Sequence, residues 1–236
     1  MDGAAPTVPR IKPDSFGLRV PGGRLEVAEI RLGGSPRGVV VVGCEAGGMD
    51  RDAADVMNRL AEHGYASIAA DLSARGSSDG ELVTGVGSLL STLADQGWSH
   101  EQVGVIGYGF GGRVAFLAAT AFELGASVSV SPRARDSVRT GLAAAAPRTP
   151  WLGLFGECGD GALDPTPTEL RAAWAAHTAI VTYPVGDFYR DSADPAVHAA
   201  AFDSWQRTVE WLNLRVAPRP TPLALAWREN GTSRAG

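Results

Sequence analysis

A glycine-rich turn at residues 107–112 has the residue types and spacing best suited to chemistry. It follows the apolar stretch Val103–Ile106 and precedes a helical pattern. As Gly-x-Gly-x-x-Gly, the turn would seat a pyrophosphate on the amino terminus of that helix, as in dinucleotide-binding proteins. As Gly-x-nucleophile-x-Gly, it would be a nucleophile elbow with Gly107 and Gly111 as the flanking glycines and Gly109 at the centre.

The dinucleotide interpretation requires an acidic residue after the next strand, where it would bind the ribose hydroxyls. That region reads Ser129-Val130-Ser131-Pro132-Arg133 and contains no acid, so Arg133 could only favour a 2′-phosphate. The stretch from Val103 to Arg135 resembles the nucleotide-binding segment of D-2-hydroxyacid dehydrogenases. NAD(P) binding through this turn is therefore retained as an alternative.

Few histidine, cysteine or lysine side chains are present for catalysis. The histidines are His63, His100, His177 and His198. Cys44 and Cys158 lack any Cys-x-x-Cys spacing. Cys44 has no histidine or lysine nearby, so its thiolate would be rare. Lys12 is the sole lysine and lies close to the amino terminus, so Schiff-base chemistry elsewhere in the chain has no amine to use.

Composition restricts the class of protein. The 236 residues, 44% of them hydrophobic, suffice for one large α/β domain with a sizeable core. A net charge of −5 offers no basic surface to nucleic acid or to an anionic membrane. No apolar run reaches the roughly 18 residues of a membrane span, and Met1–Lys12 has no signal-peptide core. We expect an acidic, cytoplasmic globular protein.

The elements that must position the turn alternate between strands and helices. A hairpin is expected from Phe16–Val20 and Leu25–Leu32. Further strands are expected at 39–42, 65–70, 103–106, 126–130, 151–155 and 179–183, and helices at 52–63, 82–96, 113–122, 168–177 and 197–212. Such alternation predicts a mainly parallel sheet with helices on both faces. We expect an arm at 1–15, one domain at 16–215 and a tail at 216–236, with chemistry at the carboxyl ends of the strands.

Five segments resemble dienelactone hydrolases, in the same order and at similar spacing. They are Val39–Met49 (VVVVGCEAGGM), Gly64–Gly76 (GYASIAADLSARG), Val105–Leu117 (VIGYGFGGRVAFL), Gly153–Pro165 and Thr208–Leu212. The resemblance covers roughly residues 25–213. It implies a compact α/β-hydrolase fold of the dienelactone-hydrolase type.

The resemblance also implies where a catalytic triad would lie, and the chain departs from it there. The family's cysteine or serine nucleophile falls on Gly109, where glycine removes both the side chain and the backbone strain of the elbow. The histidine, in a Gly-His-x-Phe loop followed by arginine, falls on Gly186 or, with a one-residue shift, on Asp187. The family acid falls near Asp160, with Glu157 and Asp164 as alternatives, and has no histidine to orient.

Other parts of the family's pocket are matched. Glu45 corresponds to a glutamate that contacts the nucleophile. Arg75 and Arg190 correspond to arginines that bind a substrate carboxylate, a task that suits the guanidinium fork. Tyr108 matches the aromatic residue before the nucleophile. The backbone amides near Phe110 and Ala46 would form the oxyanion hole.

The expected function is therefore a non-hydrolytic use of a hydrolase pocket. Glu45 would act as acid or base on a small carboxylate- or carbonyl-bearing substrate, in an isomerase, lyase or cyclase of secondary metabolism. We expect no metal ion or cofactor. The alternatives are a catalytically dead homologue that binds a ligand or partner, an NAD(P)-binding oxidoreductase, and a conventional ester or lactone hydrolase.

Overall fold

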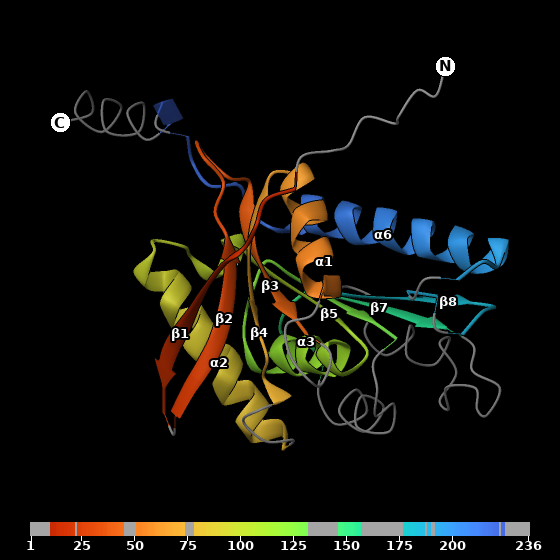
Figure 1. The fold of residues 1–236 in the computed structure, drawn as a ribbon, viewed down its shortest axis with the longest axis horizontal. Helices are drawn as coiled ribbons and strands as arrows, with labels where there is room; N and C mark the ends of the chain where they lie inside the picture. The colour runs from red at the N-terminus through yellow and green to blue at the C-terminus, as the bar shows by residue number, and fades with distance from the viewer. Residues whose placement is uncertain are drawn as a thin grey trace.

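The structure, a computed structural model, describes residues 10–21, 23–44, 51–73, 78–131, 146–156, 177–186, 188–189, 192–221 and 223–224. Its strands are β1 (Asp14–Val20), β2 (Gly23–Ile30), β3 (Gly38–Gly43), β4 (Tyr65–Ala70), β5 (Val103–Tyr108), β6 (Ala126–Val130), β7 (Trp151–Gly156) and β8 (Thr178–Tyr183). They form one eight-stranded sheet in the order β1-β2-β4-β3-β5-β6-β7-β8 (Figure 1).

The sheet has an antiparallel edge and a parallel body. β1 and β2 pair as a hairpin in which Asp14 faces Glu29 and Val20 faces Gly23. β2 then pairs antiparallel with β4, whereas the strands from β4 through β3 to β8 are all parallel. The carboxyl ends of the parallel strands therefore lie along one edge of the sheet.

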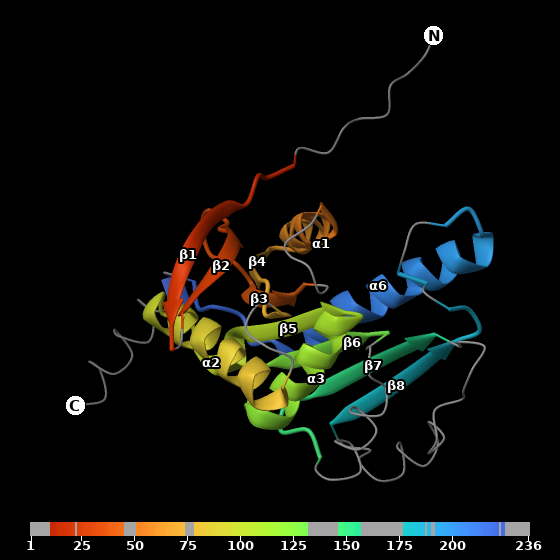
Figure 2. The same cartoon turned by 60° about the horizontal axis from the view of Figure 1, so that its bottom comes forward.

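Helices cover both faces of the sheet. α1 (Arg51–Glu62) and α6 (Pro195–Arg215) lie on one face, and α2 (Asp79–Asp95) and α3 (Phe110–Ala121) lie on the other (Figures 1 and 2). A short 3₁₀ helix, His100–Gln102, leads into β5. This three-layer arrangement is the one that the alternating pattern predicts.

Local sequence signals set the helix ends. Ser78 and Glu81 form a capping box at the start of α2, each side chain hydrogen-bonding the other residue's backbone. Asp194 caps α6 through the N–H of Ala196, and Pro195 opens the helix. Gly64, with φ +81°, ends the turn between α1 and β4.

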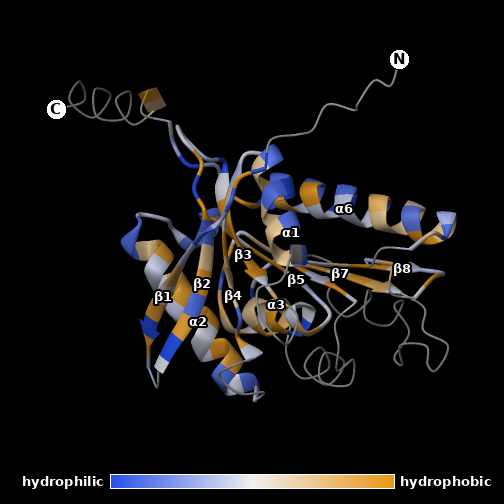
Figure 3. Cartoon of the chain, in the orientation of Figure 1, coloured by the Kyte–Doolittle hydropathy of each residue, from blue (hydrophilic) through white to orange (hydrophobic). Residues whose placement is uncertain are grey.

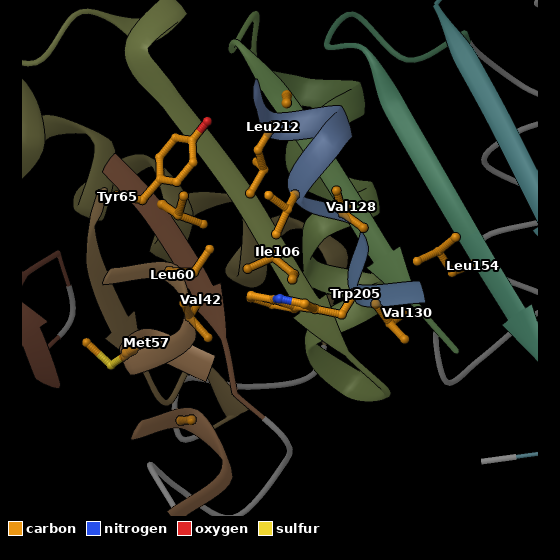
Figure 4. Packing of buried hydrophobic residues seen from close by; sticks show 14 of the residues in the cluster. Val42, Met57, Leu60, Tyr65, Ile106, Val128, Val130, Leu154, Trp205 and Leu212 are labelled. Carbon is orange, nitrogen blue, oxygen red and sulfur yellow. The ribbon is translucent and has the colours of Figure 1, made fainter. Parts of the chain in front are cut away.

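Each face of the sheet has its own apolar core. The α1–α6 core is the cluster that joins Met57, Leu60 and Trp205 to the central strands (Figure 4). The α2–α3 core is the cluster on the other face, which includes Leu82, Leu89 and Val114. Strands β3 to β7 are apolar almost throughout. The polar residues lie mainly on the outer faces of the helices and on the β1–β2 hairpin (Figure 3). Burial on both faces explains why these strands read as continuous apolar runs.

The structure confirms the expected fold class and adjusts the ends of several elements. β5 extends two residues beyond the expected end, to Tyr108, and α3 begins at Phe110 rather than at Arg113. The helix expected at 168–177 lies outside the described residues except for His177. β1 begins at Asp14, inside the expected arm, and Ile11 is hydrogen-bonded to Asn58 of α1.

Candidate active site

The loops that follow the parallel strands lie along the carboxyl edge of the sheet, where ligands bind in α/β folds (Figure 2). They begin after Gly43 in β3, Ala70 in β4, Tyr108 in β5, Val130 in β6, Gly156 in β7 and Tyr183 in β8. The elements on either side of these loops therefore define the candidate site.

The turn between β5 and α3 has Gly109 at its vertex. The backbone of Gly109 has φ 52° and ψ −111°, outside the regions that L side chains adopt without strain. Its N–H donates to the carbonyl of Val130 at 2.9 Å, and its carbonyl accepts from the N–H of Arg113 at 3.3 Å. The turn is thus a sharp strand-to-helix reversal fixed on both sides.

The glycines beside the vertex allow three segments of backbone to touch. A β-carbon on Gly107 would lie 2.0 Å from the carbonyl oxygen of Gly111, and one on Gly111 would lie 2.1 Å from that of Gly43. The first turn of α3 therefore packs directly on the ends of β5 and β3. Helix packing alone requires glycine at both positions.

The sheet topology argues against the dinucleotide interpretation of this turn. In a dinucleotide-binding fold the glycine-rich turn follows the first strand of the doubly wound sheet. Here the chain runs from β3 to its neighbour β4 and then returns to β5 on the other side of β3. The corresponding turn would follow β3 at Gly43, whereas the glycines of interest follow β5.

The two residues beside Gly109 point to opposite faces of the sheet. Tyr108 packs against the α1–α6 core and Phe110 against the α2–α3 core. Burial raises the pKa of the Tyr108 hydroxyl to about 12, opposed by the nearby cation of Arg59. The amide of Phe110 opens α3, where helix geometry leaves N–H groups without intrahelical partners. Such an amide is suited to stabilising negative charge.

The loop after β8 approaches the vertex through aromatic side chains that the sequence interpretation did not assign. Phe188 is fully buried and packs on Tyr183, with ring centroids 4.6 Å apart. The next residue, Tyr189, contacts Tyr108, with centroids 5.8 Å apart. The one sequence signal was that Phe188 aligns with the phenylalanine of the family's Gly-His-x-Phe loop, and Arg190 with the arginine that follows it.

Ser131 is a second residue that the sequence interpretation did not single out. It follows β6 with φ 40°, and among the described residues it alone combines a positive φ with a side chain. Its N–H donates to the carbonyl of Leu154 at 2.8 Å. Ser131 directly follows Val130, whose carbonyl accepts from the N–H of Gly109. Strained backbone of this kind is typical of functional sites.

The loop between β4 and α2 is fixed at both ends. Asp71 accepts hydrogen bonds from the backbone N–H of Ser73 at 3.0 Å and from its hydroxyl at 2.6 Å. At the other end Ser78 begins the capping box of α2, and Asp79 forms an ion pair with Arg113 of α3. The segment between them, which contains Arg75, lies outside the described residues.

The remaining expected site residues also lie outside the described residues. They are Glu45, Ala46, Arg75, Asp160, Asp187 and Arg190, with the alternatives Glu157 and Asp164. Their expected roles remain predictions. Gly186, at one of the two positions expected for the family histidine, is described and follows β8.

The histidines lie mainly away from the carboxyl edge. His63 precedes β4, His100 precedes β5 and His177 precedes β8, so these three lie at the amino ends of parallel strands. His198 is on the first turn of α6, where its Nε2 contacts the carbonyl of Ser192.

Two further observations concern metals and membranes. Within the described ranges, no group of three or more His, Cys, Asp or Glu side chains is placed to hold a metal ion. No helix in the described part of the chain is long and apolar enough to span a membrane.

The strand order and the strand–turn–helix at Gly109 define an α/β-hydrolase fold. The model of the dienelactone hydrolase family matches residues 30–215, so the chain belongs to the dienelactone hydrolase family. No curated protein matches the sequence.

Solved structures support the same fold. A Klebsiella pneumoniae protein described as a dienelactone hydrolase is 23% identical, with 85% of this chain and 98% of the other covered and a TM-score of 0.68. A dienelactone hydrolase-like promiscuous phosphotriesterase from metagenomic libraries is 18% identical, covering 84% and 96%, with a TM-score of 0.65. A cold-adapted esterase from an Arctic intertidal metagenomic library is 15% identical, covering 86% and 93%, also with a TM-score of 0.65.

Proposed function

We propose that this chain is a non-hydrolytic enzyme, an isomerase, lyase or cyclase, that acts on a small carboxylate- or carbonyl-bearing substrate. The observation that carries the proposal is Gly109 at the vertex of the β5–α3 turn, with φ 52° and ψ −111°. In α/β hydrolases the side chain at such a vertex attacks the substrate. Glycine has no side chain, so no acyl-enzyme forms at this position.

The placement of three of the four histidines supports the same conclusion. A hydrolytic triad needs a histidine within hydrogen-bond reach of the nucleophile. His63, His100 and His177 lie at the amino ends of strands, opposite the edge at which Gly109 lies. The segment that resembles the family's histidine loop has Gly186 and Asp187 in its place.

The proposed acid or base is Glu45. It lies two residues beyond Gly43, whose carbonyl approaches Gly111 closely enough to exclude a β-carbon. The carboxyl end of β3 is therefore in contact with the first turn of α3. In the proposed reaction Glu45 moves a proton on the substrate, and the amides of Phe110 and Ala46 stabilise the developing oxyanion.

The proposed substrate anchors are Arg75 and Arg190. Arg75 lies between the Asp71–Ser73 turn and the cap of α2, and Arg190 directly follows Tyr189 in the loop after β8. Two arginines on separate loops of one edge suit a substrate with a carboxylate, because each guanidinium can bind both of its oxygens. The proposal of a carboxylate-bearing substrate rests on these two arginines.

The test is whether the purified protein retains a small carboxylic acid. We expect denaturation and mass spectrometry to release one from the wild type and to show its loss in Arg75→Ala and Arg190→Ala. Arg24→Ala is the matched control, because Arg24 is an exposed hairpin residue paired with Glu26. Retention by both site variants, or no bound acid in the wild type, would contradict the carboxylate clamp.

Conventional ester hydrolysis is the second candidate, and the comparisons favour it. The family and the similar structures are named for hydrolases and esterases. Hydrolysis would require a water molecule activated directly, because the vertex has no nucleophilic atom. An ester assay separates the two candidates.

A further inference from the structure

Ser131 leaves the sheet beside the vertex of the β5–α3 turn. It directly follows β6, which lies between β5 and β7 (Figure 2). Val130, the last residue of β6, is in register with Tyr108 of β5 and Leu154 of β7. Its carbonyl accepts from the N–H of Gly109 at 2.9 Å, and the N–H of Ser131 donates to the carbonyl of Leu154 at 2.8 Å. Ser131 and Gly109 are therefore the first residues beyond two paired strand ends, and both lie on the carboxyl edge.

The backbone of Ser131 has a conformation that the rest of the described chain gives only to glycine. Its φ is 40°, and every other described residue with a positive φ is a glycine. A β-carbon is strained in this region, whereas glycine adopts it freely. Such strain persists only where something compensates for it, and it concentrates at binding and catalytic sites. Serine at this position therefore indicates a role for its side chain.

The hydroxyl of Ser131 has no structural partner in the described part of the chain. The two preceding serines of β6 do have one: Ser127 donates to the carbonyl of Ala115 in α3 at 2.8 Å. Ser129 donates to the carbonyl of Gly112 at 2.7 Å. Ser131 comes next in the alternation of an extended strand, but its φ ends the extended backbone and its hydroxyl forms no such bond to a described residue. Nor is this oxygen among the buried polar atoms that lack a partner, so it is open to solvent.

We propose that Ser131 is a substrate-binding residue of the candidate site, where its hydroxyl donates a hydrogen bond to an oxygen of the bound carboxylate or carbonyl. The substrate class in this statement rests on the proposed function. An open hydroxyl supplies a donor without breaking a hydrogen bond inside the protein. Such a contact explains why serine is present where glycine would relieve the strain, because binding sites often keep strain that lowers stability.

Thermal unfolding tests whether the Ser131 hydroxyl serves binding rather than the fold. Ser131→Ala and Ser131→Gly both remove it, and glycine also relieves the strain. We expect the melting temperature of Ser131→Ala to stay within about 1 °C of the wild type, and that of Ser131→Gly to be unchanged or higher.

The matched control is Ser129→Ala, because the Ser129 hydroxyl is hydrogen-bonded inside the protein. This control should melt about 4 °C or more below the wild type. Losses in both Ser131 variants as large as the loss in the control would show that the Ser131 hydroxyl is structural and would overturn the proposal.

Titration with benzoate measures the proposed contact. Benzoate is a small carboxylate, and tryptophan fluorescence reports its binding to the wild type, to Ser131→Ala and to Ser91→Ala, a control at an exposed position of α2. We expect Ser131→Ala alone to bind about threefold or more weakly, because a hydrogen bond to a charged group is lost. Equal affinities, or no binding by the wild type, would overturn the hydrogen bond.

A thiol at residue 131 tests the position without relying on the strength of one hydrogen bond. In Ser131→Cys, iodoacetamide labels the new thiol, and peptide mass spectrometry separates it from Cys44 and Cys158. We expect saturating benzoate to slow this labelling by about threefold or more, because it covers the thiol, and to leave the labelling of Ser91→Cys unchanged. No labelling of Ser131→Cys, or labelling that benzoate does not slow, would overturn the position assigned to Ser131.

The arginine variants in the same titration separate this inference from the proposed function. Benzoate binding that is weakened by Arg190→Ala but not by Ser131→Ala would retain the arginine anchor and reject Ser131. Binding that is weakened by Ser131→Ala but by neither Arg75→Ala nor Arg190→Ala would retain Ser131 and reject the arginine anchors.

Discussion

Gly107 and Gly111 touch through their backbones, because a β-carbon on Gly107 would lie 2.0 Å from the Gly111 carbonyl oxygen. The contact joins the end of β5 to the first turn of α3 and holds Gly109 at the vertex between them. The spacing of these glycines is therefore a packing requirement of the turn itself. The same packing requirement would apply with any residue at position 109.

The first prediction is that Gly107→Ala lowers the free energy of unfolding by about 3 kcal/mol, because the new methyl group meets backbone that cannot move aside cheaply. Gly80→Ala is the control, since Gly80 lies in the first turn of α2 with no neighbouring atom within 4 Å of a β-carbon. We expect it to be neutral or to stabilise by about 0.5 kcal/mol. Urea unfolding measures both, and equal stability of the two variants would refute the packing argument.

The second prediction concerns Ser129, whose hydroxyl donates to the Gly112 carbonyl at 2.7 Å and accepts from the Trp151 indole N–H at 2.8 Å. Both side chains are fully buried. Ser129→Ala should cost about 2 kcal/mol, because it leaves the indole N–H and the carbonyl without this partner. Ser88→Ala on the exposed face of α2 should change stability by less than about 0.5 kcal/mol. Urea or thermal unfolding measures both variants. A smaller loss of stability in Ser129→Ala than in Ser88→Ala would contradict the role of the Ser129 hydroxyl.

The third prediction is a pH dependence carried by Asp203. Its hydrogen bonds with Arg207 and then Tyr183 lower the pKa of the carboxyl group in the folded protein. A lowered pKa stabilises the fold above the unfolded value of about 3.9, and this contribution is lost as the pH falls through the folded value. Asp203→Asn should therefore destabilise by about 0.5–1 kcal/mol near neutral pH, a modest amount because the carboxylate is half exposed.

Unfolding at two pH values checks this prediction. The difference between the wild type and Asp203→Asn should shrink as the pH falls from about 7 to about 3. Asp95→Asn, at the exposed end of α2, is the control and should show a smaller change. A difference for Asp203→Asn that is constant across this range would show that the carboxylate does not carry the effect.

Most of the fold could be predicted from the sequence because the buried strands are short, mainly apolar runs. β4 and β6 have the expected bounds, because Gly64 directly precedes β4 and Gly125 directly precedes β6. The start of α3 was missed by three residues, because Gly111 and Gly112 have low helix propensity, and the contact of Gly111 with Gly43 of β3 depends on the tertiary fold.

The candidate site could be predicted only where a local motif marks it. The turn around Gly109 has such a motif, and the structure confirms that it joins a strand to a helix. The contact of Tyr189 with Tyr108 joins residues 81 positions apart and depends on the path of the loop after β8. No spacing in the sequence indicates such a contact. The same holds for the Tyr183 hydrogen bond to Asp203, which depends on how α6 crosses the sheet.

The most direct test of the central claim is an aryl-ester assay on the purified wild type, Glu45→Ala and Gly109→Cys, with 4-nitrophenyl acetate as the probe. The claim predicts that the wild type hydrolyses the ester no faster than Glu45→Ala, because neither has a nucleophile at residue 109. It also predicts that Gly109→Cys releases at most one equivalent of nitrophenol quickly, because its thiol is acylated and no histidine promotes deacylation. Sustained turnover by the wild type above Glu45→Ala would contradict the claim and establish the chain as a hydrolase.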